Sequence, residues 1–321
     1  MDSVSQLTLG AAVSMAAMGR RAPLWQSALA GACCGTLPDL DVFLDHGDAI
    51  RNMTLHRTES HALVWLTLFS PLLAWLIAGA LQQKYQWVRW WPAVWLALIT
   101  HPLLDLMTVY GTQLGLPFTD YPWAIGSIYI IDPLYTLPLI IGLIAALWRQ
   151  APRWNRAGLA LSSLYLLWGM AAQLIATQQV APQVAQRVNS EAKLLVTPTA
   201  FNTLVWRIVA VTPDNYYEGY WSLLSPRRPL QLTATHRGKA FFQRWQGDWA
   251  VARVAWFSHG FFAMRQRGGH LLIEDLRMGE APDFIFTFDL GTPQARARHP
   301  SRLPYGRPSL AQTWRQLRQR L

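Results

Sequence analysis

A small set of histidines and aspartates lies within an otherwise apolar stretch of the chain. Its members are Asp39, Asp41, His56, His61, His101, Asp105 and Asp132. Ionisable side chains at membrane depth are costly, so residues of this kind are candidates for function. Imidazole nitrogens and carboxylate oxygens together bind zinc, manganese or iron. The residue types therefore predict a divalent metal site, without choosing between these metals.

The spacing of His101 and Asp105 is the most informative within this set. Residues four apart lie on one face of a helix, so both side chains can bind a single cation. Pro102 removes a backbone hydrogen bond and can bend the helix where it carries the two ligands.

His56 and His61 would diverge by about 140° on a regular helix, because they are five residues apart. We therefore expect His56 in the loop before the helix. Asp39 and Asp41 face the same way if their segment is extended. Either aspartate could then bridge two metals, and Asp41 could act as a general base.

Some of these residues have simpler interpretations. A single histidine or aspartate inside a membrane more often makes a helix-packing hydrogen bond than a metal bond. Asp132 precedes Pro133 and could cap a helix instead of binding metal. Both roles of Asp132 stay open. Arg57 would neutralise a carboxylate, or a phosphate of substrate or lipid, and it is a candidate catalytic residue together with Asp41.

The segments that must position these residues are long apolar runs. Four of them are long enough to cross a bilayer, which takes about 20 residues. They are residues 62–81, 90–108, 128–148 and 157–177. Two shorter segments rich in Ala and Gly precede them, residues 4–18 and 24–37. These two are either thin spans or half-embedded helices that pack closely through small residues.

The basic residues of this half predict its orientation. Three connections share one side if all six segments cross, and the positive-inside rule makes that side cytoplasmic. These connections carry Arg20 and Arg21, then Lys84 and Arg89, then Arg149, Arg153 and Arg156. The loop 109–127 has no Lys or Arg and falls outside. The seven candidate ligands then meet at the non-cytoplasmic face of a multi-pass inner (plasma) membrane protein. The C-terminal half is expected on the same side.

Composition separates the chain into two halves. Hydrophobic residues make up 52% and charged residues 14% of the 321 residues, which excludes disorder and an ordinary soluble globule. Residues 1–179 carry nine basic and nine acidic side chains, so the whole net charge of +10 lies in residues 180–321. We expect a mainly α membrane protein, a multi-helix transmembrane bundle followed by a small β-rich soluble domain. The expected parts are a membrane domain (1–178), a linker (179–200), a β-rich domain (201–295) and a basic tail (296–321).

The C-terminal half favours a small antiparallel sheet. Its β-rich runs are residues 204–211, 216–224, 249–258, 270–275 and 284–290. Turn signals such as Gly268-Gly269 separate them.

The basic tail, residues 296–321, carries seven arginines and no acidic residue. The partner of the membrane half is the lipid bilayer, and the candidate partner of the tail is the anionic headgroups of lipids. A nucleic-acid partner is not expected, and the oligomeric state is not predicted.

Three motifs resemble those of a known family. They are Leu37-Pro38-Asp39-Leu40-Asp41, the stretch from His56-Arg57 to His61, and Thr100-His101-Pro102-Leu103-Leu104-Asp105. They are similar to the motifs of membrane-bound, predicted metal-dependent hydrolases, the YdjM-like family, and Ile131-Asp132-Pro133-Leu134-Tyr135 extends the similarity across the membrane half. That family is distantly similar to zinc-dependent phospholipases C. The resemblance implies hydrolysis of a phosphoester or a similar bond, with zinc as the first metal to test.

One departure from the family lies between the two histidines. The family usually reads His-Arg-Gly-x-Thr-His-Ser, whereas this chain has Thr58 in place of Gly and Ser60 in place of Thr. The loss of Gly argues against a tight backbone approach at this position.

The residues and the resemblance together predict a membrane-bound metal-dependent hydrolase. Its substrate would carry a phosphoester or other ester bond and be lipid-linked or amphipathic, because the site lies at the membrane surface. The alternative is a non-catalytic metal-binding membrane protein, such as a transporter or a scaffold. A transporter should carry ionisable residues along a path between the two faces, whereas here they gather at one face.

Overall fold

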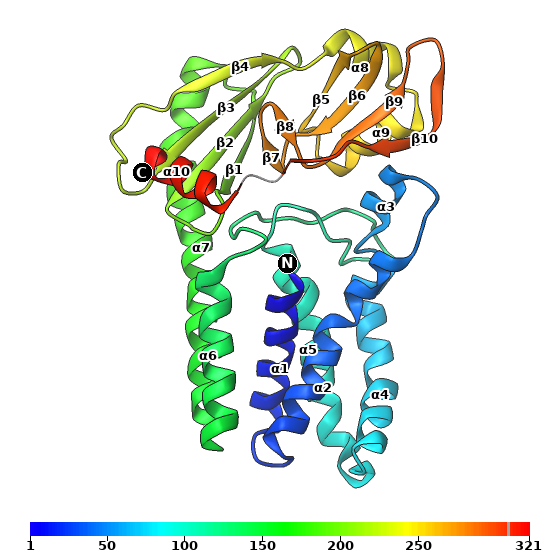
Figure 1. The fold of residues 1–321 in the computed structure, drawn as a ribbon, viewed down its shortest axis with the longest axis vertical. Coiled ribbons are helices and arrows are strands. Elements are labelled where there is room, and N and C mark those ends of the chain that lie inside the picture. Colours follow the sequence, from blue (N-terminus) through cyan, green and yellow to red (C-terminus); the bar gives the residue numbers. More distant parts are fainter. Residues whose placement is uncertain (307–308) are drawn as a thin grey trace. The chain divides into compact units, whose positions relative to one another are not determined.

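The computed structural model describes residues 1–306 and 309–321, so Arg307 of the basic tail lies outside the described residues (Figure 1). The chain forms two compact units, residues 1–43 with 57–170, and residues 44–56 with 171–321. The first unit is helical and the second is rich in β-strands. The expected order, a helical N-terminal region followed by a β-rich C-terminal region, is confirmed.

The helical unit consists of helices that run alongside one another (Figure 1). They are α1 (Ser3–Met18), α2 (Leu24–Thr36), α4 (Leu63–Ala80), α5 (Trp87–Leu106), α6 (Pro133–Arg149) and the first part of α7 (Pro152–Arg187), with the short 3-10 helices η1 (Pro38–Phe43), η2 (Glu59–His61) and η3 (Lys84–Gln86). Within the described residues, α4 and α7 are the two helices long and apolar enough to cross a membrane. Helix α6 begins later than the apolar run 128–148, because Asp132 caps its first turn.

Helices α1 and α2 pack through glycines. A methyl group added at Gly10 would overlap the carbonyl oxygen of Gly31, and one added at Gly35 would overlap that of Gln6. This agrees with the expectation that these Ala/Gly-rich segments pack closely through small residues. The close approach also sets where the carbonyl group of Gly35 and the side chain of Gln6 can reach.

The second unit contains two four-stranded antiparallel sheets, with strand orders β1-β2-β3-β4 and β10-β9-β6-β5. The strands are β1 (Lys193–Pro198), β2 (Val205–Val211), β3 (Asn215–Ser222), β4 (Leu232–His236), β5 (Phe262–Arg267), β6 (His270–Asp275), β9 (Thr287–Gly291) and β10 (Arg296–Arg302), with a hairpin of β7 (Gly279–Glu280) and β8 (Asp283–Phe284). Its helices are α3 (Ala49–Leu55), α8 (Lys239–Trp245), α9 (Trp249–Phe257) and α10 (Leu310–Arg320). The second part of α7 packs on the first sheet, where Ala176 and Val180 share a core with Trp206 and Ile208.

The expected strand at residues 249–258 is wrong, because this segment is helix α9. Asp248 caps the helix by accepting hydrogen bonds from the amides of Ala250 and Val251. Val251, Val254 and Phe257 are its buried large residues, at the three-residue spacing of one helix face. The β-branched and aromatic content of the segment therefore reflects a buried helix face rather than a strand.

The basic segment after residue 296 is largely structured. Residues 296–302 form β10, which pairs with β9, and residues 310–320 form α10, which begins with a capping box between Ser309 and Gln312. Arg320 makes a two-pronged ion pair with Glu280, with nitrogen–oxygen distances of 2.9 and 2.7 Å.

Candidate metal centre

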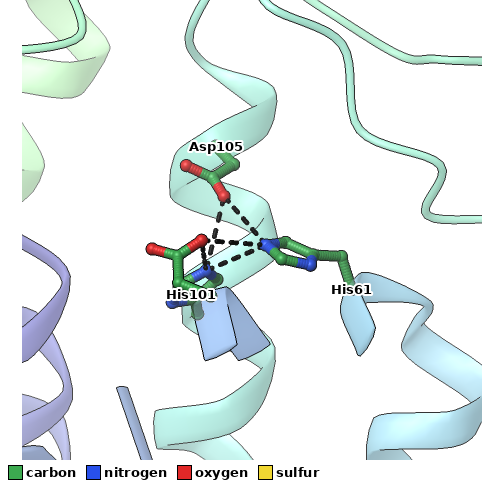
Figure 2. A group of neighbouring side chains, drawn as sticks. His61, His101 and Asp105 are labelled. Atoms are coloured by element: carbon green, nitrogen blue, oxygen red, sulfur yellow. Dashed lines mark hydrogen bonds and ion pairs between the residues drawn. The ribbon is translucent and has the colours of Figure 1, made fainter. Parts of the chain in front are cut away.

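Four of the predicted ligands come together in the helical unit. Asp39 lies on η1, directly after α2, and His61 ends η2, directly before α4. His101 and Asp105 lie one turn apart near the end of α5, and Figure 2 shows their side chains converging with that of His61. Segments from three separate parts of the sequence therefore form one group.

The facing atoms of this group are two imidazole nitrogens and two carboxylate oxygens. The Nε2 atoms of His61 and His101 are 3.1 Å apart. Each Nε2 atom also lies 3.4 Å from Oδ1 of Asp39 and 3.4 Å from Oδ2 of Asp105. In a tetrahedral zinc site with metal–ligand bonds of about 2.0–2.1 Å, neighbouring ligand atoms lie about 3.3 Å apart. The spacing therefore fits four ligands around one cation.

The two carboxylate oxygens provide a second test of this fit. Oδ1 of Asp39 and Oδ2 of Asp105 are buried and have no hydrogen-bond partner within the described chain. A buried carboxylate oxygen without a partner is costly, and a bound cation removes that cost.

Each histidine is oriented by a contact to its Nδ1 atom, the ring nitrogen that faces away from the other three ligands. Nδ1 of His101 lies 2.6 Å from the carbonyl oxygen of Gly35 and must donate to it. Nδ1 of His61 lies 2.8 Å from Oγ of Ser60. In a neutral imidazole whose Nδ1 carries the proton, Nε2 has a free lone pair, which is the form that binds a metal.

The other oxygen of Asp105 is held by positive charge and an amide. Nη2 of Arg57 lies 3.1 Å from Oδ1, and Nε2 of Gln6 donates to it at 3.0 Å. The amino group of Met1 contacts the same oxygen. These contacts fix the carboxylate so that Oδ2 points to the histidines. Nε and Nη1 of Arg57 are buried without a partner among the described residues, which leaves two donors for an anionic group.

Arg57 also has an unusual backbone. Its φ of 65° lies in the left-handed region that costs energy for a side chain larger than Gly. Its amide donates to Oδ2 of Asp41 at 2.9 Å, and its carbonyl accepts from the amide of Gln113 at 3.0 Å. Thr58, which replaces the family Gly, has a φ of −101° and needs no Gly.

Three predicted ligands are not members of the four-residue group. Asp41 uses Oδ2 to accept from Arg57 and, at 2.6 Å, from the hydroxyl group of Ser60. His56 follows the last turn of α3, in the second unit. A direct role of either residue at the metal stays a prediction.

Asp132 is the third of these residues. It caps α6 through the amide of Leu134 and accepts from the hydroxyl group of Tyr165 at 2.9 Å. The capping role that the sequence left open therefore accounts for its hydrogen bonds.

Sequence reasoning missed two residues that hold the histidines. Gly35 acts through a backbone carbonyl, which has no residue-type signal. Ser60 lies next to His61, but a single hydroxyl residue beside a histidine is common. Gln6, on α1, supports Asp105 by donating to its Oδ1 atom.

Comparison with known proteins assigns the chain to a family. Residues 1–176 match the family model described as YdjM inner membrane protein. The chain is 24% identical over 187 residues to "Uncharacterized protein YfhP" of Bacillus subtilis (strain 168), a match that covers 57% of this chain and 54% of that protein. The chain thus spans about half the length of this curated relative. No solved structure matches. The chain therefore belongs to the YdjM inner membrane protein family, a family of predicted membrane-bound metal-dependent hydrolases.

Proposed function

We propose that the protein is a membrane-bound hydrolase that uses one divalent metal, with zinc as the first candidate, to cleave a phosphoester or related ester bond. The metal would be held by Asp39, His61, His101 and Asp105. The observation that carries this proposal is the spacing of their four facing atoms, which lie within 4.8 Å of one another, together with the two buried carboxylate oxygens that lack a partner within the described residues.

Each residue around the site has a distinct part in this chemistry. With water as a fifth ligand, a divalent metal bound here would acidify that water and polarise the bond under attack. Asp105 would bind the metal with one oxygen while Arg57 and Gln6 hold the other. The two free donors of Arg57 would bind a phosphate oxygen, since a guanidinium group can pair with two anions at once.

The surface of the helical unit supports insertion in a lipid bilayer. Large apolar side chains on three helices are more than half exposed, including Leu68 on α4, Ile141 on α6 and Leu164 on α7. An apolar surface of this kind is unfavourable in water but matches lipid. We propose a multi-pass inner membrane protein whose metal site and C-terminal unit lie on the non-cytoplasmic side, as the distribution of basic loops predicts.

Apolar residues beside the site favour an amphipathic substrate. Val42 and Phe43 are exposed on η1, the same short helix that carries Asp39. Phe118 and Trp123 are exposed on the loop 109–127, whose Gln113 is bonded to Arg57. A substrate with a phosphate group at the metal and an apolar part at these side chains fits this arrangement.

Metal analysis of the purified full-length protein tests the proposal. We expect about one zinc per chain in the wild type and a loss of at least about tenfold in affinity in His101→Ala and Asp105→Ala, because each removes one of four ligands. Asp132→Asn is the matched control, since Asp132 is a buried aspartate whose bonds cap a helix. Unchanged metal content in both ligand variants would refute the site.

The alternative, a non-catalytic metal-binding membrane protein, is decided by a second measurement. The metal-loaded wild type should hydrolyse at least one member of a panel of phosphoesters and phospholipids, and Arg57→Met should reduce that rate. A protein that binds zinc but hydrolyses no member of the panel would support a transporter or a scaffold.

A further inference from the structure

The two histidines of the metal centre differ in what holds them. His101 donates to a neutral backbone carbonyl, that of Gly35. His61 faces a hydroxyl group that is itself bound to a carboxylate. The difference matters because the group behind a metal-bound histidine fixes its tautomer and increases its basicity, most strongly when that group is an anion.

The proton positions along the second contact follow from the chemistry of each group. Oδ2 of Asp41 can only accept when ionised, so the hydroxyl group of Ser60 donates to it across 2.6 Å. With its proton committed there, Oγ of Ser60 accepts from Nδ1 of His61 across 2.8 Å. The direct distance from Nδ1 to Oδ2 of Asp41 is 3.6 Å, too long for a hydrogen bond. Ser60 therefore links the carboxylate to the imidazole.

Asp41 is itself fixed in place by the backbone. The amide of Arg57 donates to the same Oδ2 atom at 2.9 Å. That amide belongs to the residue with the left-handed φ of 65°. The strained residue therefore places its side chain at Asp105 and its amide at Asp41.

We infer that Ser60 and Asp41 form a relay that positions His61 as a metal ligand, with the serine hydroxyl holding the proton on Nδ1 so that the Nε2 lone pair faces the cation. This inference rests on the proposed metal centre and assigns a positioning role to two residues outside the four-residue group. It also gives Asp41 a role different from the bridging ligand or general base expected from sequence.

The first test is zinc affinity of the full-length protein, measured by competition with a chromophoric chelator. Ser60→Ala should weaken zinc binding by about 10- to 100-fold, the usual effect of losing such a partner. Ser60→Thr should restore it, because threonine keeps the hydroxyl group. Ser70→Ala is the matched control, since Ser70 is a buried serine on α4 that accepts from Trp91.

The second test reads the tautomer of His61 in the metal-free protein by ¹⁵N NMR of the imidazole groups, with the His61 signals identified by their absence in His61→Gln. The wild type should carry its proton on Nδ1, and Ser60→Ala should show a mixture of tautomers. Asp41→Asn should lie between them, because an amide oxygen still accepts from Ser60 but carries no charge.

The outcomes separate this inference from the proposed function. Equal zinc affinity and the same tautomer in Ser60→Ala and the wild type would overturn the relay while leaving the metal centre intact. Zinc binding as weak in Ser60→Thr as in Ser60→Ala would also count against it. A wild type that binds no zinc would refute the metal centre, and the NMR measurement would still decide whether the hydroxyl group sets the tautomer.

Discussion

Nδ1 of His101 lies 2.6 Å from the carbonyl oxygen of Gly35, so a residue without a side chain on α2 orients a histidine on α5. Helix α1 passes directly against Gly35, where a methyl group would meet the carbonyl oxygen of Gln6 and Cα of Gly10. This position on α2 therefore requires a residue without a side chain. Helix packing and metal binding therefore depend on the same residue.

Gly35→Ala should reduce both stability and zinc binding. Helices α1 and α2 must separate to admit the methyl group, at a cost of about 1–3 kcal/mol, and the carbonyl group moves away from His101. We expect a lower thermal midpoint and zinc affinity at least about tenfold weaker. Gly247→Ala is the control, because nothing lies within 4 Å of the added methyl group. Zinc affinity equal to the wild type in Gly35→Ala would contradict this dependence.

Arg57→Lys should separate anion binding from metal binding. A lysine keeps one positive charge near Asp105 but lacks the second pair of donors that would bind phosphate. Binding of inorganic phosphate to the zinc-loaded protein, measured by calorimetry, should weaken by about tenfold, the loss of one charged hydrogen bond. Zinc content should stay the same.

The control for this variant is Arg51→Lys, on the exposed arginine that pairs with Asp48. Both substitutions preserve charge, so they isolate the effect of the guanidinium group at the site. Phosphate affinity that is unchanged in Arg57→Lys would remove Arg57 from substrate binding.

Glu274 should make the β-rich unit less stable as the pH rises. Burial raises the pKa of this carboxyl to about 7, although Arg265 opposes the shift. The folded protein then holds a proton that the unfolded chain, with an ordinary pKa of 4.5, releases earlier. The stabilisation is complete below the ordinary pKa and is lost between pH 4.5 and about 7, with an upper bound of about 3 kcal/mol.

Thermal unfolding of the full chain at about pH 5 and about pH 8 measures this effect. Glu274→Gln should reduce the difference between the two midpoints, since glutamine does not titrate. Exposed Glu191→Gln should leave the difference as it is in the wild type. An unaltered difference in Glu274→Gln would show that other groups cause it.

Arg320 should hold the C-terminal helix α10 on the β-rich unit. Its guanidinium group pairs with both oxygens of Glu280 and lies 3.6 Å from the ring centre of Tyr220. Arg320→Ala should free the helix and make chymotrypsin cleavage after Trp314 several-fold faster, because one two-pronged ion pair is worth about 1–3 kcal/mol. Arg318→Ala, at an exposed position, is the control. Equal cleavage rates in the two variants would assign the docking of α10 to other contacts.

The sequence alone was sufficient for the features that depend on residue type and short spacing. His101 and Asp105 are four apart, so any helix through them brings both side chains to one face. The apolar runs predicted helices, and the change of charge after residue 179 predicted a different C-terminal half. The segment 249–258 was misread, because β-branched and aromatic residues suit a buried helix face as well as a strand.

Tertiary structure decided which of the other polar residues join that pair. Asp39 and His61 reach it because α2 and η2 end beside α5, whereas Asp132 lies at the start of α6, where its oxygens bind Leu134 and Tyr165. The contacts of Gly35 and Ser60 with the histidines were also not predictable, since one is a backbone carbonyl and the other a common hydroxyl group. The physical reason is that spacing along a chain fixes neighbours only within one element, while contacts between elements depend on how closely those elements pack.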